Sequence, residues 1–262
     1  MSGLLENKTA IIYGAGGAIG GGVARAFAQE GARVFLAGRT RESLDTVAGE
    51  IKSGGGAAEV AVVDALDERA VDDLVRRAAS KGASVDVSFN LITRGDVQQI
   101  PLVDMTTADL TRAVTAGLTS NFITARAAAR QMIKQGSGVI LHLNSGSAKG
   151  TMPLMGSTGP ADAASETFMR YLAAEVGPSG VRVVGIYTAG VADTLTREKI
   201  AKVGGGEGMD PADVERMIAG MTMLRRAPRL ANVADTAVFL ASDRAAGITG
   251  TIVNVTCGLL PG

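Results

Sequence analysis

A cluster of glycines near the start of the chain has the spacing of a phosphate-binding turn. The segment Gly14-Ala15-Gly16-Gly17-Ala18-Ile19-Gly20 follows a short β-branched run and precedes apolar residues at helical spacing. A diphosphate reaches the free N–H groups of a helix N-terminus only where no side chain blocks the backbone. A second apolar run at 33–37 completes a strand–turn–helix–strand unit, which favours a dinucleotide-binding fold over a flexible linker.

The residues after the second apolar run bear on which dinucleotide the chain would bind. An acidic residue there favours a bare ribose hydroxyl, whereas a basic residue favours a 2′-phosphate. The sequence Ala37-Gly38-Arg39-Thr40-Arg41 contains no acid. It therefore predicts NADP as the cofactor rather than NAD, with Arg39 near the phosphate. The alternative is that Arg39 and Arg41 only begin a solvated helix face.

Strand-like and helix-like patterns alternate along the rest of the chain. Strands are expected at Ala10–Tyr13, Arg33–Ala37, Ala57–Val63, Val85–Ile92, Gly138–Leu143, Val181–Tyr187 and Thr251–Val255. Helices are expected at Arg41–Lys52, Asp67–Ala79, Thr107–Lys134, Pro160–Val176 and Asn232–Ala241. This alternation predicts one α/β domain over residues 1–262, a doubly wound Rossmann-type parallel sheet of about seven strands with helices on both faces.

A long segment at 188–228 interrupts the alternation between the sixth and seventh strands. An insertion after the carboxyl end of a strand in this fold commonly covers the ligand crevice, so we expect a substrate lid. It contains an amphipathic helix candidate at Asp210–Met223 and several methionines. With Met152 and Met155 these would form an adaptable apolar wall for an apolar or acyl substrate, unless they only fill the core.

Composition excludes several classes of protein. The 262 residues contain 26 basic and 26 acidic side chains without a basic block, which argues against a nucleic-acid partner. The chain has one cysteine, no signal-like N-terminus and no apolar run of the roughly 20 residues that span a bilayer. No spacing of His, Cys, Asp or Glu suggests a metal site. We therefore expect a cytoplasmic protein that acts on a small molecule and does not bind membranes.

The order of these motifs resembles the short-chain dehydrogenase/reductase family over nearly the whole chain. The glycine turn is similar to that family's TGxxxGxG motif, with Tyr13 and Ala18 as replacements, and the segment 86–93 is similar to DVLVNNAG and keeps Asn90. The resemblance implies an oxidoreductase that forms homodimers or homotetramers through its Ala-rich helices. It places the cofactor at Gly14, Gly16, Gly17, Ala18, Ile19, Gly20, Arg39, Asp64, Ala65 and Asn90.

The resemblance also locates the positions of the family's catalytic residues. Ser145 matches the family Ser, but Thr158 stands where the family has Tyr, Asp162 where it has Lys, and Gly117 where it has the relay Asn. A Thr hydroxyl lacks the ring that makes a phenol acidic, so it is a poor proton donor. A carboxylate would raise a neighbouring pKa, which is the wrong direction for the family's proton transfer. The usual Tyr–Lys chemistry is therefore absent.

Asp162 has three possible roles in the sequence. On a helix it shares a face with Thr158, one turn away, where a desolvated carboxylate acts as a general acid or base or accepts from ribose hydroxyls. The favoured alternative is helix capping, with Gly159 as N-cap and Pro160 at the first helical position. Capping implies that this helix begins later than in the family.

Two hypotheses for function follow from these residues. The first is an NADP(H)-dependent oxidoreductase with a non-standard site at Ser145, Thr158 and Asp162, acting on an apolar carbonyl or enoyl substrate. The second is a catalytically impaired member that serves as a nucleotide-binding or assembly module. Among other candidates, His142 is expected in the core and Tyr171 in the core or an interface. Lys149 is expected in a surface loop, and the alternative is that it reaches the nicotinamide end.

Overall fold

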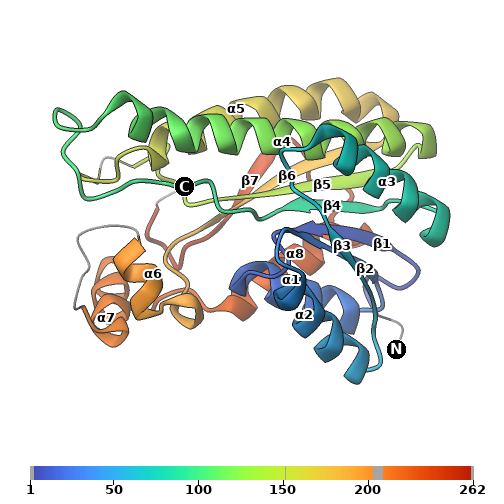
Figure 1. Ribbon diagram of the computed structural model, residues 1–262, viewed down its shortest axis with the longest axis horizontal. Coiled ribbons are helices and arrows are strands. Elements are labelled where there is room, and N and C mark those ends of the chain that lie inside the picture. The colour runs from blue at the N-terminus through green and yellow to red at the C-terminus, as the bar shows by residue number, and fades with distance from the viewer. Residues whose placement is uncertain (1–2, 151, 203–208, 261–262) are drawn as a thin grey trace.

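One parallel sheet of seven strands organises the computed structural model, which describes residues 3–150, 152–202 and 209–260. The strand order is β3-β2-β1-β4-β5-β6-β7 (Figure 1). The strands are β1 (Thr9–Tyr13), β2 (Arg33–Gly38), β3 (Ala57–Val62), β4 (Val87–Asn90), β5 (Gly138–Asn144), β6 (Val181–Thr188) and β7 (Thr251–Val255). The order reverses between β1 and β4, where this fold class binds its ligand. The predicted doubly wound α/β fold is confirmed.

Helices cover both faces of the sheet. The α-helices are α1 (Ala18–Gln29), α2 (Arg41–Ser53), α3 (Glu68–Gly82), α4 (Thr107–Gln135), α5 (Thr158–Val176), α6 (Arg197–Lys202), α7 (Pro211–Met221) and α8 (Leu230–Ala241). Short 3-10 turns lie at η1 (Gly177–Ser179), η2 (Ala192–Thr194) and η3 (Asp243–Ala245). Helices α3, α4 and α5 pack on one face, and α1, α2 and α8 pack on the other (Figure 1).

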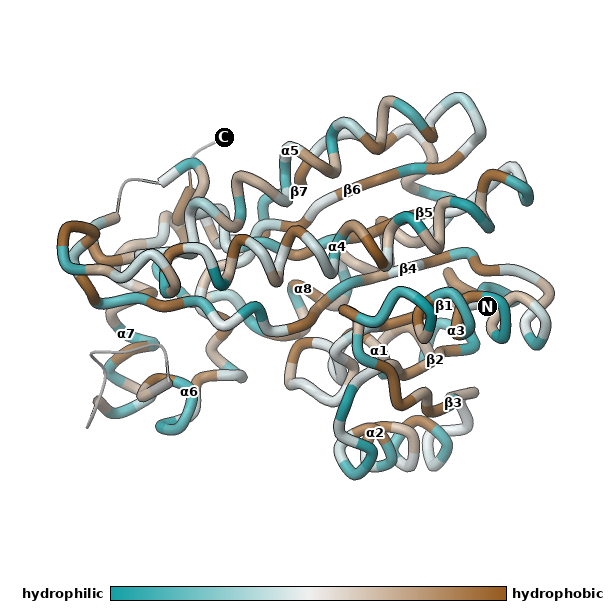
Figure 2. Tube along the Cα trace, turned by 45° about the horizontal axis from the view of Figure 1, so that its top comes forward, coloured by the Kyte–Doolittle hydropathy of each residue, from teal (hydrophilic) through white to brown (hydrophobic). Residues whose placement is uncertain are grey.

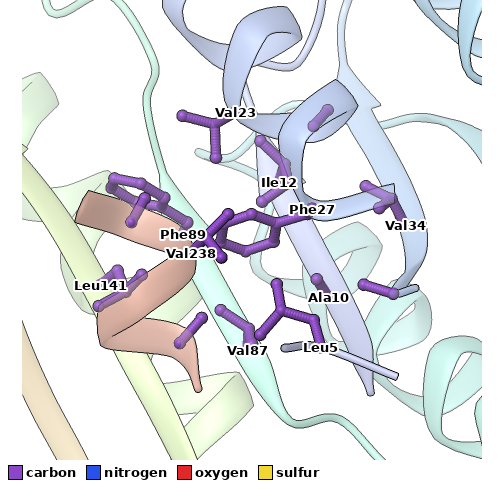
Figure 3. Close-up of a cluster of buried hydrophobic side chains, with 14 of the residues drawn as sticks. Leu5, Ala10, Ile12, Val23, Phe27, Val34, Val87, Phe89, Leu141 and Val238 are labelled. Carbon is purple, nitrogen blue, oxygen red and sulfur yellow. The ribbon is translucent and has the colours of Figure 1, made fainter. Parts of the chain in front are cut away.

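The core is divided into two apolar layers, because successive side chains of a strand point to opposite faces. Ile12 of β1 belongs to the layer under α1 and α8, whereas Ile11 and Tyr13 belong to the layer under α4 and α5. Figure 3 shows Phe27 of α1 between the strands and Val238 of α8. A sheet buried on both faces holds the carboxyl ends of its strands in fixed positions, and the candidate site lies at those ends.

Helix α5 begins at Thr158, earlier than the predicted start at Pro160. Ser157, the residue before it, does not cap the helix; its Oγ accepts from Val97 N at 3.0 Å. Pro160 lies in the first turn, where a missing N–H leaves no hydrogen bond unmade, so the proline does not delay the helix. Asp162 is the fifth helical residue, and the predicted capping role is wrong.

The segment 188–228 contains η2, α6 and α7, except that residues 203–208, with the predicted loop glycines Gly204, Gly205 and Gly206, lie outside the described ranges. In both Figure 1 and Figure 2, α6 and α7 lie together beyond one end of the sheet, away from α2 and α3. The segment has a small apolar cluster of its own around Ile218. A backbone bond from Ala192 N to Pro228 O at 2.9 Å joins the two ends of the segment, and one from Leu224 N to Cys257 O at 3.1 Å attaches it to the body.

Candidate functional site

The glycine turn links β1 to α1 at the sheet's crossover point. Gly14 has φ +78°, and its N–H donates to Ala37 O at 2.9 Å, which joins the turn to β2. A Cβ at Gly14 would lie 2.5 Å from Leu91 O, and one at Gly20 would lie 2.2 Å from Gly14 O. These two positions therefore exclude any side chain, since backbone atoms cannot move aside cheaply.

The start of α1 has the open backbone that a diphosphate needs. Gly17 is the N-cap and makes no side-chain capping bond, and the first intrahelical bond runs from Gly21 N to Gly17 O at 2.7 Å. The N–H groups of the first turn consequently have no partner within the helix. Gly17 and Ala18 are exposed, so no side chain of the described residues covers this helix end. The turn fits a nucleotide diphosphate.

The ends of β2 and β3 lie beside this turn in the sheet order. Arg39 and Arg41 are exposed and form no ion pair with the described residues. Asp64 follows β3, and its Oδ1 accepts from Leu66 N at 3.0 Å. Ala65 is buried beside it. This edge therefore presents two free cations where an acid would be needed to bind a bare ribose hydroxyl.

Asn90 ends β4 and is buried. Its Nδ2 donates to Ser120 Oγ at 3.3 Å and Thr124 Oγ1 at 3.4 Å on α4. Its Oδ1 accepts from Ile92 N at 3.1 Å. The side chain thus fixes the backbone that leaves β4, and it forms part of the wall of the cleft described below.

The structure brings two of the three predicted catalytic residues into direct contact. Ser145, just after β5, donates from Oγ to Asp162 Oδ2 at 2.7 Å, and its N–H donates to the same oxygen at 3.2 Å. Ser147 N donates to that oxygen at 3.1 Å. Asp162 is 0% exposed. The carboxylate therefore holds the turn after β5 rather than the end of its own helix.

An arginine whose side chain is 15% exposed balances the charge of Asp162. Arg94, in the loop after β4, donates from Nη1 to Asp162 Oδ1 at 2.7 Å. Its Nη2 donates to Asp96 Oδ1 at 2.7 Å and its Nε to Asp96 Oδ2 at 3.3 Å. Burial acts to lower the pKa of Arg94, but the two carboxylates outweigh it and the pKa is raised. The guanidinium is therefore a permanent counter-ion.

Gly117 on α4 makes room for this arginine. A Cβ at Gly117 would lie 2.6 Å from Arg94 Cδ, so a larger side chain there would displace Arg94. The resemblance put the family's relay Asn at this position. The departures at 117 and 162 are thus physically connected, because Gly117 leaves the space for Arg94 and Asp162 requires Arg94 as its counter-ion.

Thr158 lies apart from the Ser145–Asp162 contact. It is 4% exposed, and its Oγ1 accepts from Gln98 Nε2 at 3.0 Å. Among the described residues, Thr158 Oγ1 is thus hydrogen-bonded to Gln98, in the loop after β4, rather than to Ser145 or Asp162. Thr158 and Asp162 do lie one turn apart on α5, as expected.

A cleft of about 1320 Å³ opens at the carboxyl ends of the strands. Ser145, Ser147, Arg94 and Gln98 line one side of it, and Ile19 and Asn90 also reach it. Its apolar wall comes largely from three segments: Met152, Pro153, Leu154 and Met155; Leu195, Ile200, Met209, Val214, Met217, Ile218 and Met221; and Leu259 and Leu260.

The methionines of this wall are not core residues. Met217 is 52% exposed, Met152 50% and Met221 43%. The interpretation that they only fill the core is therefore wrong for these three. Flexible thioether side chains at the edge of a cleft are suited to apolar ligands of varied shape.

The other candidates also have defined surroundings. His142 is buried in β5 as expected, and burial, aided by the charge of Arg94, lowers its pKa to about 4. Lys149 is exposed and lines the cleft, with Nζ 5.4 Å from the Tyr187 ring centroid. Tyr171 is 70% exposed, so the core interpretation is wrong for it.

Among the described residues no group of three potential metal ligands occurs, and none of the helices there combines the length and the apolar character that a membrane span requires.

Sequence reasoning missed Arg94, Asp96, Gln98 and Ser147. The first three lie at 91–106, a loop without periodicity that follows the short strand β4. A signal was available in the charges, because a buried carboxylate at position 162 requires a partner. A cation directly after β4 and a glycine at 117 were the two features that pointed to Arg94.

Comparisons with known proteins agree with this architecture. The family model described as enoyl-(acyl carrier protein) reductase matches residues 14–260. The 7α-hydroxysteroid dehydrogenase of Escherichia coli strain K12 is 30% identical over 254 residues, covering 97% of this chain and 94% of that protein. A solved 7α-hydroxysteroid dehydrogenase complexed with NADH and 7-oxo glycochenodeoxycholic acid is similar with a TM-score of 0.83 and 30% identity, over 98% of this chain and 96% of the other. An NAD⁺-bound xylitol dehydrogenase has a TM-score of 0.86 and 26% identity, over 97% and 99% of the two chains.

Proposed function

Since this chain belongs to the short-chain dehydrogenase/reductase family of oxidoreductases, we propose that it is an NADP(H)-dependent enzyme with a non-standard active site. The observation that carries the proposal is the hydrogen bond between Ser145, which faces the cleft, and the buried Asp162. Bound nucleotide supplies or accepts a hydride in such proteins. The chain's own residues bind the nucleotide, orient the substrate and hold its proton.

The nucleotide would lie across the crossover point of the sheet. Gly14, Gly16, Gly17, Ala18, Ile19 and Gly20 would hold the diphosphate, Asp64 and Ala65 the adenine end, and Asn90 the wall near the nicotinamide. The family uses either dinucleotide, and the two solved relatives above hold NADH and NAD⁺. Our preference for NADP rests on the exposed Arg39 and Arg41 and on the lack of an acid between them.

The substrate would be an apolar carbonyl or enoyl compound. Residues 188–228, the proposed lid, contribute Met217, Ile218 and Met221 to the apolar wall. Burial of apolar substrate surface there would contribute roughly 25 cal/mol per Å². Ser145 and Ser147 would lie beside the reacting oxygen, and Asp162 would act through Ser145. Thr158 would be limited to positioning the loop through Gln98, because its hydroxyl is not an acidic group.

The proposal is tested first by binding of nucleotide. The chain has no tryptophan, so the emission of the reduced nicotinamide itself is followed in titrations with NADPH and NADH. We expect saturation by both and tighter binding of NADPH. No saturable change in emission with either nucleotide would contradict both the proposed cofactor and the proposed enzymatic function. A panel of apolar ketones and enoyl compounds, monitored by nucleotide absorbance, then tests turnover.

The second candidate function is a binding or assembly module that retains the fold. It is favoured by Thr158, which is buried and bonded to Gln98 and so differs from an exposed acidic phenol. Exposed apolar side chains on α4 and α5, such as Phe122 at 41% and Tyr171 at 70%, are consistent with pairing into a homodimer or homotetramer. Nucleotide binding without turnover of any substrate in the panel would favour this function.

A further inference from the structure

Ser145 and Ser147 both line the cleft, and the direction of their hydroxyl hydrogens follows from their neighbours. A serine hydroxyl has one hydrogen to donate, and an ionised carboxylate only accepts. Ser145 Oγ therefore donates its hydrogen to Asp162 Oδ2 at 2.7 Å. Ser147 Oγ lies 2.7 Å from Ser145 Oγ, whose hydrogen is already used, so Ser147 is the donor of that bond. Ser145 Oγ also accepts from Ser147 N at 3.3 Å, so both of its lone pairs are used, and the lone pairs that remain for a ligand are those of Ser147 Oγ.

Arg94 supports this direction, because it supplies the carboxylate of Asp162 with a counter-ion. Asp162 is 0% exposed and would be costly to charge alone, but Arg94 Nη1 donates to its other oxygen at 2.7 Å. The backbone N–H groups of Ser145 and Ser147 add two further donors to Oδ2. Four donors in total converge on one buried carboxylate, so all of these hydrogen bonds use it as the acceptor.

We propose that the Arg94–Asp162 pair, acting through Ser145, sets Ser147 as a hydrogen-bond acceptor, so that the cleft selects the hydroxyl form of its substrate over the carbonyl form. The proposal rests on the function proposed above and deepens it. A substrate hydroxyl donates to Ser147 Oγ, whereas a carbonyl oxygen finds no serine hydrogen there. The site is thus matched to an alcohol–ketone pair rather than to an enoyl compound, which has no hydroxyl in either form. Asp162 and Arg94 act here as positioning residues.

The test compares two ligands that differ only in the group concerned. Binding of 2-octanol and of 2-octanone to the nucleotide-free full chain is measured by titration calorimetry. One hydrogen bond contributes about 1 kcal/mol, so we expect 2-octanol to bind about fivefold more tightly than 2-octanone. Equal affinities in the wild type, or tighter binding of the ketone, would overturn the proposal.

Two variants release a serine hydrogen into the cleft. Asp162→Ala frees the hydrogen of Ser145, and Arg94 keeps Asp96 as its counter-ion. Ser145→Ala frees the hydrogen of Ser147 and leaves the ion pair in place, so it serves if Asp162→Ala does not fold. In each variant the ratio of the two affinities falls from about five to about one. A wild-type ratio retained in both would also overturn the proposal.

Glu166→Gln is the matched control. Glu166 is a second buried carboxylate on α5, one turn beyond Asp162, and it accepts from Asn144 and Tyr187 rather than from Ser145. Its ratio of affinities should equal that of the wild type.

Failure of this inference is separable from failure of the proposed function. Saturable NADPH binding with no alcohol preference refutes only the inference, whereas alcohol preference without nucleotide binding refutes only the function.

Discussion

The glycine turn after β1 and the turn after β5 differ in how their structure arises. At the glycine turn, backbone atoms fill the space that a Cβ would need, as at Gly14 and Gly20. At the turn after β5, by contrast, the arrangement depends on side chains from three separate elements: Ser145, Arg94 and Asp162. A backbone-defined site keeps a recognisable spacing in the sequence. A side-chain network can change every residue type, provided that the charges and volumes change together.

The largest effect should come from removing Arg94, the counter-ion of the buried Asp162. Arg94→Met leaves two carboxylates without their counter-ion, and breaking a buried pair in this way costs about 4 kcal/mol of unfolding free energy. The matched control is Arg76→Met, because Arg76 pairs with Asp73 on the surface of α3. Its cost should stay below about 0.5 kcal/mol. Equal losses in urea unfolding would contradict the importance we give to the side-chain network.

A second buried group of the same region should give a pH-dependent effect. His142 lies in β5, and its pKa is lowered to about 4 by burial and, to a smaller extent, by Arg94. His142 is therefore protonated in the unfolded chain below about pH 6.5, but in the folded chain only below about pH 4. Stability should fall with decreasing pH across this window, by about 3 kcal/mol in total from this group.

His142→Leu isolates that contribution. Neither ring nitrogen of His142 has a hydrogen-bond partner among the described residues, so the substitution leaves no new unsatisfied group. The difference in unfolding free energy between the variant and the wild type should grow as the pH falls from 7 to 4, in favour of the variant. A constant difference across that range would show that His142 does not titrate as inferred.

The glycine turn should tolerate almost no added volume. Gly20→Ala places a methyl group 2.2 Å from Gly14 O and must open the turn, at a cost of about 2 kcal/mol, with a loss of NADPH affinity. Gly49→Ala on α2 meets nothing within 4 Å and should stabilise the chain by about 0.5 kcal/mol or more. If both substitutions had the same effect, the close approach of α1 to the turn would be refuted.

The smallest expected effect concerns the choice of nucleotide. Arg39→Gln removes an exposed cation after β2, and NADPH affinity should fall about tenfold while NADH affinity changes little. Arg33→Gln, at the opposite end of the same strand, is the control and should change neither affinity. A parallel loss for both nucleotides in Arg39→Gln would place Arg39 outside the 2′-phosphate subsite.

The fold was predictable because each element has a local cause. The alternation of strand and helix patterns placed all seven strands within a few residues, since apolar runs and glycine turns act over short distances. The start of α5 was not predictable, because the Ser157 side chain accepts a hydrogen bond from Val97 N instead of capping the helix. The role of Arg94 was not predictable either, because its position depends on a glycine at 117 and a carboxylate at 162 that are remote in sequence.

One measurement tests the central claim that oxidoreductase chemistry persists here without the Tyr–Lys pair. Nucleotide-dependent turnover of apolar alcohols and ketones is compared in the wild type, in Asp162→Asn and in Thr158→Tyr/Asp162→Lys. We predict turnover by the wild type and its loss in Asp162→Asn. Turnover that occurs only in the double variant would contradict the claim and favour a binding or assembly module.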